Sequence, residues 1–489
     1  MNLLIDTNIF IPLEPTSMQE AVAGSASVAI LLQTAQTVHA GIFIHPEIIQ
    51  DIQRDPDLER QGLHMRAISK YRQLPAPPHV ATLPRSCVPA SVQGTNDWVD
   101  NCLIAAVYGN ACDFLVTEDQ KMHSKARKLG IAGRVLFLQD ALDLLSTLAD
   151  HPPTTKPNVE FCYFHEIDCK QPFFDSLRAD YPEFDDWFAK SARNHRQAFV
   201  IREKAAKTVV AIAAIKEEDA LPDGARGKIL KLCTLKVCET HMGMRYGELL
   251  LSSVCEYCHK GRYTHAYFTA FPRHEALLSF AETFGFERVA TANSRGEHAY
   301  VKRLVYGEHD ECRMSAVEFY KAFGPQVVTF ARNKSFIVPI QPRFLVRLWP
   351  ELDRGGQLFA PEPCGNSIRK AYLCHSSTKL LRPGDNLLFY RSQEQPAVVT
   401  IGTVESVTRT CDAAAVIRRV GSRTVYSMEQ VADLCRKRTL VILFRNAETL
   451  STPISLIELR RNGAIPSAPQ SIIQVAKEAI PWLKQRVRT

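Results

Sequence analysis

Short apolar runs that end in acids alternate with helix-like stretches over the first 145 residues. The runs NLLI (2–5) and FLV (114–116) are followed by Asp6 and by Glu118 and Asp119. Between them, segments such as TNDWVDNCLIAAV carry apolar residues at helical spacing. Strands separated by helices predict a parallel sheet covered by helices, whose ligands bind at the carboxyl ends of the strands. We therefore expect the acids after these two strands to face each other.

The rest of the chain has two further patterns of strands. AFVIREK, TVVAIAAIKEE and KILKLCTLKV follow one another, and a turn with two glycines, a helix-like run and AYFTAF come next. After residue 330, FIVPIQP, NLLFYRS, AVVTIGTVESV and LVILFR alternate with basic turns, which predicts a mostly β module. HPPTTKPN (151–158) reads as a linker, and a softer joint lies near 306–314. The predicted domains are 1–150, 158–305 and 330–489.

Length and charge agree with this division. A chain of 489 residues is too long for one hydrophobic core. No apolar run is long enough to span a membrane and no secretory signal is recognisable, so we expect a cytoplasmic protein. Residues 331–489 hold 24 Lys and Arg against 12 Asp and Glu, a net +12, whereas the first 330 residues hold 35 against 40, a net −5. This split is typical of a polyanion-binding module beside other domains, although a merely solvated basic surface would give the same totals.

The acids of the first domain form a candidate metal site. Cleavage of a phosphodiester by metal-activated water needs several carboxylates from separate elements, because Mg²⁺ and Mn²⁺ prefer oxygen ligands. Asp97 and Asp100 share a face of their helix. Taken alone, each acid could instead be a helix cap or a solvated side chain rather than a metal ligand. The candidate ligands are Asp6, Glu47, Asp97, Asp100, Glu118 and Asp119.

The motifs IDTNIF, D-x-x-D before LIAAV, and VTED before a basic helix resemble the PIN domain, a metal-dependent nuclease fold, over residues 1 to about 145. The resemblance gives the catalytic and metal-ligand roles to Asp6, Glu47, Asp100 and Asp119. Asp97 and Glu118 would be extra ligands, supported by Thr7, Asn8 and Thr117. It implies cleavage of RNA with Mg²⁺ or Mn²⁺, and many PIN domains are toxins of toxin–antitoxin pairs. A PIN-like scaffold that binds RNA without cutting it is the alternative.

The turn HMGMRYG (241–247) lies between a strand-like run and a helix-like run. Free N–H groups at the start of such a helix suit a pyrophosphate. With its flanking elements, the series resembles the GNAT acetyltransferase fold over residues 160 to about 305. The resemblance implies that the main chain of Leu235 and Val237 meets the pantetheine arm of acetyl-CoA. The phosphates would face the N–H groups of Gly243, Met244, Arg245, Tyr246 and Gly247.

Three positions depart from the GNAT pattern. Met242 stands where the family has Arg or Gln, and Arg245 stands where it has Gly. Ala281 replaces the tyrosine that many members use as general acid, and neither Tyr263 nor Tyr267 is at the matching place. Glu217 and Glu218 end a strand that could reach the acceptor, although a charge pair there is also typical of a solvated hairpin end. The sequence therefore names neither the acid nor the base.

The third domain, with R-P-G-D (382–385) before an apolar strand, resembles the ASCH or EVE type of PUA-like β-barrel. This fold is tied to RNA binding. Cations beside aromatic residues can hold phosphate while a ring stacks on a base, although Tyr390 and Phe444 could equally fill the barrel. The predicted RNA contacts are Arg369, Lys370, Tyr390, Arg391 and Arg423.

Together these features predict a multidomain protein with an α/β PIN-like domain, an α+β GNAT-like domain and a mostly β PUA-like barrel. The leading hypothesis is metal-dependent cleavage of RNA, for which tRNA is a candidate, coupled to acetyl-CoA binding or acetyl transfer. One alternative is an acetyltransferase acting on RNA, aminoacyl-tRNA or protein, with a non-cleaving PIN-like clamp. Another is a toxin-like effector held by an antitoxin or other protein partner. A homo-oligomer is compatible with all three.

Overall fold

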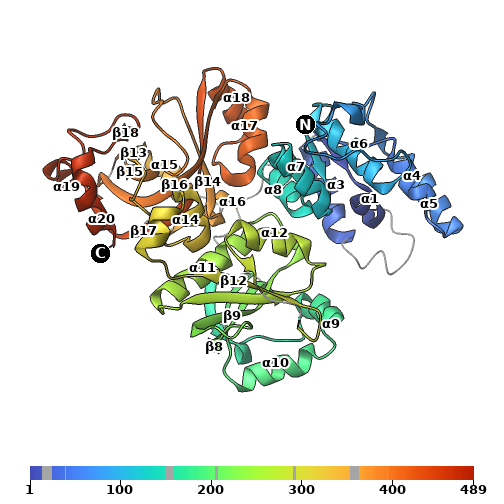
Figure 1. Cartoon of the computed structure of the whole chain (residues 1–489), viewed down its shortest axis with the longest axis horizontal. Coiled ribbons are helices and arrows are strands. Elements are labelled where there is room, and N and C mark those ends of the chain that lie inside the picture. Colours follow the sequence, from blue (N-terminus) through green and yellow to red (C-terminus); the bar gives the residue numbers. More distant parts are fainter. Residues whose placement is uncertain are drawn as a thin grey trace. The chain divides into compact units, whose positions relative to one another are not determined.

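The computed structural model describes residues 1–13, 25–38, 40–148, 159–203, 207–289, 293–352, 363–393 and 395–488. The chain forms two compact units (Figure 1). The first comprises Met1–His151 and Glu239–Gly243, and the second comprises Pro152–Cys238 and Met244–Thr489. The linker predicted at 151–158 lies outside the described residues. Among the residues described, no helix combines the length and apolar character needed to cross a membrane.

The first unit contains the parallel sheet that its sequence pattern predicts. Its strand order is β3-β2-β1-β4-β5, and all neighbours run parallel. Because β1 pairs with both β2 and β4, the order reverses direction beside β1, where parallel sheets place their ligand sites. The strands are β1 (Asn2–Ile5), β2 (Gly41–Ile44), β3 (Arg72–Gln73), β4 (Phe114–Val116) and β5 (Val135–Leu136).

Helices connect these strands and cover the sheet (Figure 1). Helix α6 (Asn96–Tyr108) begins after Thr95, whose hydroxyl accepts a hydrogen bond from the Trp98 N–H. Its residues Leu103 to Val107 are all buried in the core. The other helices are α1 (Thr7–Leu13), α3 (Ser25–Thr37), α4 (Ile48–Gln53), α5 (Leu58–Ile68), α7 (Gln120–Lys128) and α8 (Leu138–Leu148).

The second unit contains two sheets, and the first has seven strands in the order β11-β12-β10-β9-β8-β7-β6. Strands β9 and β10 run parallel, whereas the other neighbours run antiparallel. The strands are β6 (Val159–Tyr163), β7 (Gln197–Arg202), β8 (Val209–Ala220), β9 (Arg226–Val237), β10 (His265–Ala270), β11 (Glu287–Arg288) and β12 (His298–Arg303).

Helices pack on both faces of this sheet. One core joins Phe268 of β10 to Leu250 and Val254 of α11 (Tyr246–Lys260) and to Leu278 of α12 (Glu275–Thr283). A second core joins Ile212 of β8 to aromatic residues around α9 (Asp175–Asp180) and α10 (Phe184–Arg193). Because side chains alternate along β10, Ala266, Phe268 and Ala270 face α11 and α12, and Tyr267 and Thr269 point to the other face.

The second sheet of this unit has six strands in the order β14-β17-β16-β15-β13-β18. Within the described residues its edge strands, β14 and β18, do not pair with each other, so the structure has an open sheet where the sequence predicts a barrel. The strands are β13 (Ser335–Ile340), β14 (Arg369–Cys374), β15 (Asn386–Arg391), β16 (Ala397–Thr410), β17 (Thr439–Ser455) and β18 (Ile473–Gln474).

Helices also accompany this six-stranded sheet. Trp349, which follows α15, is fully buried against Phe389 and Phe444 of the sheet. Helices α13 and α14 join the two sheets along the chain. The helices of this region are α13 (Glu308–Arg313), α14 (Ala316–Phe323), α15 (Pro342–Leu348), α16 (Pro363–Asn366), α17 (Ala413–Val420), α18 (Met428–Cys435), α19 (Leu456–Arg461) and α20 (Ile480–Arg488).

Candidate functional site

The parallel pair β9 and β10 separates along its length. Its registered pairing runs from Ile229 and His265 to Lys231 and Tyr267 and stops there. Strand β9 continues beside β8 as far as Val237, and β10 continues to Ala270. The edge of β9 that includes Leu235 and Val237 therefore lies beyond the paired part, where an extended ligand could hydrogen-bond to the main chain.

Helix α11 begins at Tyr246, soon after this open stretch. The N–H groups of its first turn have no acceptor within the helix, and the helix dipole makes this end positive. Arg245 precedes the helix with φ +56°, and Gly243, with φ +98°, groups with the first unit. In the second unit, the predicted phosphate site therefore consists of Met244, Arg245, Tyr246 and Gly247.

The Arg245 side chain is directed towards the six-stranded sheet. Its guanidinium donates hydrogen bonds to Ser422 Oγ at 3.2 Å and to Glu248 Oε1 at 3.1 Å. Glu248 is buried, and burial alone would raise its pKa, but the charges of Arg245 and Arg423 outweigh burial and hold the pKa below its usual value. The arginine that the sequence places beside the phosphates thus has a carboxylate partner inside the protein.

Glu248 is a buried partner of Arg245 that the sequence reasoning missed. Its Oε2 accepts hydrogen bonds from Ser367 Oγ at 2.9 Å, from the Ile368 N–H at 2.7 Å and from the Arg369 N–H at 3.3 Å. The first turn of α11 is thereby tied to the start of β14. In the sequence, an acid in the first turn of a helix reads only as a favourable interaction with the helix dipole.

Most of the residues predicted to contact RNA have side chains that are directed into the protein. Arg369 donates to Glu405 Oε2 at 2.9 Å, and burial lowers the pKa of Arg423 to about 9. Lys370 is 2% exposed and donates to the Cys364 and Gly365 carbonyls, and Tyr390 is also 2% exposed. A nucleic acid at the surface would not reach Lys370 or Tyr390, which corrects the prediction for these two. Arg391 is half-buried and bonds to the Gln395 carbonyl.

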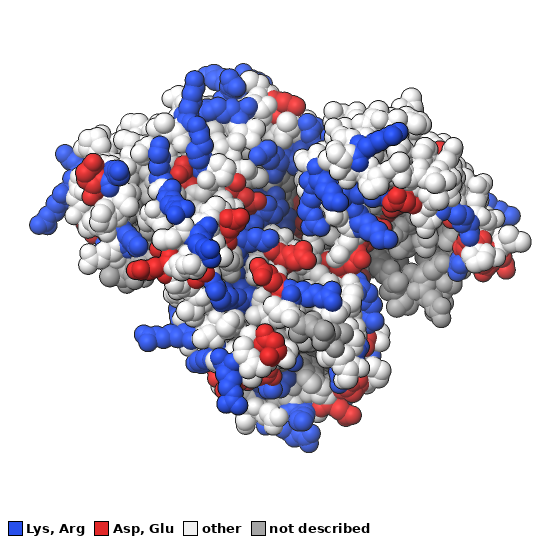
Figure 2. Space-filling view, in the orientation of Figure 1, with Lys and Arg blue, Asp and Glu red and all other residues white. Residues whose placement is uncertain are grey.

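A cavity of about 450 Å³ does bring arginines and aromatic rings together beside the six-stranded sheet. Arg343 and Arg347 lie one turn apart on α15, and the rings of Phe344 and Tyr426 are 5.2 Å apart. On the face shown in Figure 2, Lys and Arg side chains are scattered and interleaved with Asp and Glu. The remaining residues that line the cavity are His375, Gln430, Asp433 and Leu434.

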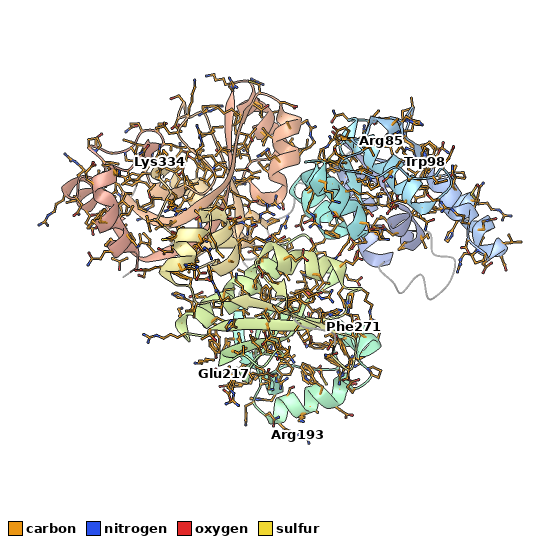
Figure 3. All side chains as sticks on the ribbon, viewed as in Figure 1. Arg85, Trp98, Arg193, Glu217, Phe271 and Lys334 are labelled. Carbon is orange, nitrogen blue, oxygen red and sulfur yellow. The ribbon has the colours of Figure 1, made fainter. Side chains whose placement is uncertain are left out.

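The two candidate bases Glu217 and Glu218 lie at the paired end of β9 and β10. Glu217 is opposite Leu230 and Glu218 is opposite Ile229, which are in the registered part of the pair. Their carboxylates accept hydrogen bonds from the hydroxyls of Tyr263 and Tyr267. Figure 3 shows Glu217 well apart from Phe271, which follows the other end of β10. Ala281, on α12, is buried in the core between this helix and the sheet.

Asp6 and Asp119 follow the carboxyl ends of β1 and β4, and Asp100 of α6 interacts electrostatically with both. Asp6 accepts hydrogen bonds from the Thr7 N–H and from Thr117 Oγ1, both at 2.7 Å. Burial raises the pKa of Asp6 to about 6, and the charges of Asp51 and Asp119 add to the rise. Burial also raises the pKa of Asp100 to about 7, with contributions from Asp6 and Asp119. Asn8 donates to Thr117 Oγ1 at 3.1 Å.

Glu47 is directed away from this group. Its carboxylate accepts hydrogen bonds from Gln50 and from Trp98 Nε1. The acid one turn later, Asp51, accepts a hydrogen bond from Thr7 Oγ1 at 3.0 Å, and burial raises its pKa. Asp51 is therefore a neighbour of Asp6 that the sequence reasoning missed. In the sequence, Asp51 could have been recognised as a further candidate because it is an acid one helical turn after Glu47.

The other two predicted ligands have local partners. Asp97 pairs with Lys125 at 2.6 Å, and Glu118 Oε1 accepts from the Leu138 N–H at 2.8 Å. Lys125 also lies 3.9 Å from Asp100, so its ammonium occupies the cation-binding side of that carboxylate. In the part of the chain that the structure describes, no group of three or more His, Cys, Asp or Glu is arranged to hold a metal ion.

Comparisons with known proteins concern parts of the chain. No curated protein matches it. ASCH from Zymomonas mobilis is 17% identical, with a TM-score of 0.25, and the match covers 31% of this chain and 94% of that chain. A GNAT-family acetyltransferase from Staphylococcus aureus is 11% identical, with a TM-score of 0.24 and coverage of 30% and 100%. A mutant of the toxin AtaT bound to the C-terminus of the antitoxin AtaR is 11% identical, with a TM-score of 0.24 and coverage of 30% and 94%.

The family comparison concerns the seven-stranded sheet. The matched residues include the separating strands β9 and β10, the start of α11 and the position of Ala281. Residues 161–286 match the model of the acetyltransferase (GNAT) family.

Proposed function

We propose that the seven-stranded part of the second unit is an acyl-CoA N-acyltransferase that binds acetyl-CoA and transfers the acetyl group to an amine. The observation that carries this proposal is the end of β9–β10 pairing at Lys231 and Tyr267, in a sheet that packs against α11. An open strand edge suits the amide-containing pantetheine arm, and a helix start suits the pyrophosphate. The match of residues 161–286 to the acetyltransferase model supports the same activity.

Each part of the site would have a separate task. The main chain of Leu235 and Val237 would align the pantetheine arm along β9. The N–H groups of Met244 to Gly247 would hold the pyrophosphate without a side-chain charge, because Arg245 is paired with Glu248. Bound acetyl-CoA supplies the thioester that the amine attacks. Holding both reactants in place supplies much of the rate enhancement in reactions of this kind.

Gly247→Glu is expected to weaken acetyl-CoA binding on the order of 100-fold, because it places a negative charge beside the phosphates. Gly247→Ala is the matched control. A methyl group at this position meets Phe280 at 3.7 Å, an ordinary contact, so binding should change little. An acid in the first turn favours the helix, so the loss would not come from unfolding. Isothermal titration calorimetry measures both affinities, and equal affinities for the two variants would contradict the proposed site.

A second candidate function, metal-dependent cleavage of RNA, is favoured by the raised pKa values of Asp6 and Asp100 in the first unit. Carboxylates whose ionisation is opposed by burial, and further by one another's charge, are suited to a divalent cation, whose charge offsets that cost. As they are described, these acids do not form a metal site, so Mg²⁺ or Mn²⁺ would be held by Asp6, Asp51, Asp100 and Asp119 only after Lys125 is displaced. Such an ion would supply an activated water. Loss of cleavage in Asp100→Asn is its test.

RNA recognition in this candidate would use the cavity lined by Arg343, Arg347, Phe344 and Tyr426. Guanidinium groups can hold phosphates while an aromatic ring stacks on a base. An antitoxin or another protein partner belongs to the same proposal, because a nuclease of this kind needs restraint in the cell.

A further inference from the structure

The open end of the β9–β10 pair has a buried carboxylate beside it. Glu297 is 7% exposed and directly precedes β12. Its neighbour in the chain, His298, is paired with Ala270, the last residue of β10. Glu297 therefore lies at the end of β10 where β9 has separated, whereas Glu217 and Glu218 lie at the paired end.

Three side chains hold the Glu297 carboxylate in place. Tyr181 donates its hydroxyl to Oε1 at 2.9 Å, whereas Thr269 Oγ1 and Asn293 Nδ2 donate to Oε2 at 3.3 and 3.0 Å. An ionised carboxylate has about four lone-pair positions, so one position on Oε1 remains for a further donor. The Tyr181 ring also stacks on Phe271, the residue after β10, with centroids 5.7 Å apart.

Among the described residues, no Lys, Arg or His side chain forms an ion pair with Glu297. Arg273 and Arg295 pair instead with Asp180 and Glu183. Burial lowers the pKa of His274, which also lies near Glu297, so this imidazole is neutral at neutral pH. A buried carboxylate without a counter-charge attracts a cation into the same space.

We infer that Glu297 is the acceptor site of the transferase, which binds the ammonium group of a primary amine and removes its proton. This inference rests on the proposed acetyl transfer. Thr269 points to the face of the sheet opposite α11, so the amine approaches from that face while acetyl-CoA occupies the gap beside α11. The chemical class of the acceptor is a primary amine, whose ammonium group supplies the one further donor that the Glu297 carboxylate can accept. Tyr181 and Thr269 are positioning residues, because they act through the carboxylate.

The reaction balances with these groups. The ammonium gives one proton to the Glu297 carboxylate, which later releases it to water. The free amine nitrogen then forms a bond to the carbonyl carbon of the thioester, and the carbon–sulfur bond breaks with its electron pair on sulfur. The second proton leaves the nitrogen as the amide forms and goes to the thiolate, giving the thiol of CoA. The Tyr181 hydroxyl keeps its proton, because burial and then the bond to Glu297 raise its pKa.

Acetylation of n-butylamine by the full chain tests this inference, with release of the CoA thiol as the readout. Glu297→Gln keeps the shape of the side chain and is expected to lower kcat/KM for n-butylamine at least about 100-fold, the lower range for loss of a general base. Tyr181→Phe is expected to lower kcat while the Kd for acetyl-CoA stays unchanged. Glu256→Gln, at an exposed glutamate of α11 that pairs with Lys260, is the control and should retain wild-type kinetics.

Calorimetry with acetyl-CoA separates the ways in which the test can fail. If the wild type does not bind acetyl-CoA, the proposed function fails and this inference fails with it. If acetyl-CoA binds, the inference alone is overturned in two cases: n-butylamine is not acetylated above the uncatalysed rate, or Glu297→Gln acetylates it as fast as Glu256→Gln does. Unchanged acetyl-CoA affinity in Glu297→Gln shows that the variant is folded.

Discussion

Replacing Glu248 with alanine is expected to lower the free energy of unfolding of the second unit by about 3–5 kcal/mol, the usual cost of removing one partner from a buried ion pair. The change leaves the Arg245 guanidinium without its carboxylate. It also removes the acceptor for the Ile368 and Arg369 N–H groups. Urea unfolding of the full chain, followed by circular dichroism, measures the effect.

Glu256→Ala provides the control on the same helix. Glu256 forms an exposed pair with Lys260 four residues later, and such pairs contribute about 0.3–0.5 kcal/mol. If the two variants lose similar stability, the buried contacts of Glu248 do not join α11 to β14 in solution.

Asp100→Asn is expected to make the first unit more stable at pH 8, by about 2–4 kcal/mol, and to abolish any Mg²⁺-dependent cleavage of RNA. Folding raises the pKa of Asp100 from 3.8 to about 7. The folded state therefore holds a proton that the unfolded state has lost. The stability that this group contributes is fully present below pH 4 and is lost as the pH rises through 7, and asparagine has no such loss.

Urea unfolding at pH 5 and pH 8 measures this difference, and incubation of the full chain with small RNA and Mg²⁺ or Mn²⁺ measures cleavage. Glu59→Gln, on the exposed surface of the same unit, should leave both results unchanged. If the free energy of unfolding of Asp100→Asn depended on pH as that of the wild type does, the raised pKa of the Asp100 carboxylate would be contradicted. If the wild type and Asp100→Asn cleaved RNA at the same rate, Asp100 would have no role in the cleavage reaction.

Patterns of apolar residues predicted the strands better than they predicted sheet closure. The parallel sheet of the first unit follows from short runs such as NLLI, whose residues Leu3, Leu4 and Ile5 are completely buried. The predicted barrel depended on whether β14 and β18 pair, and a strand's own residues do not specify its edge partner. The open six-stranded sheet could therefore not be read from alternation alone.

The direction of individual side chains was harder to predict. Glu47 and Asp51 are one helical turn apart, and the start of α4 at Ile48 decides which of them faces Asp6. Lys370 lies on a strand with Arg369, and only the fold shows that its ammonium is buried against the Cys364 and Gly365 carbonyls. Arg245 donates a hydrogen bond to Ser422, which lies 177 residues later in the chain. Contacts between residues so far apart in the chain leave no pattern in the sequence around either residue.

The residues of the candidate acceptor site could not be predicted from the sequence either. Glu297, Thr269 and Tyr181 belong to three separate segments, and no sequence motif joins them. The sequence named no base, and only the structure places Glu297 at the end of β10 where β9 has separated. Glu297 does not replace the general acid that is absent at Ala281.

Hydrogen–deuterium exchange of the full chain with and without acetyl-CoA tests the central claim most directly, because the proposed ligand contacts are main-chain groups. Acetyl-CoA is predicted to slow exchange in two segments, residues 232–237 of β9 and residues 244–248 at the start of α11. Protection should disappear from both in Gly247→Glu and remain in Gly247→Ala. Unchanged exchange in these segments, or protection confined to other parts of the chain, would contradict the claim that the open end of the β9–β10 pair binds acetyl-CoA.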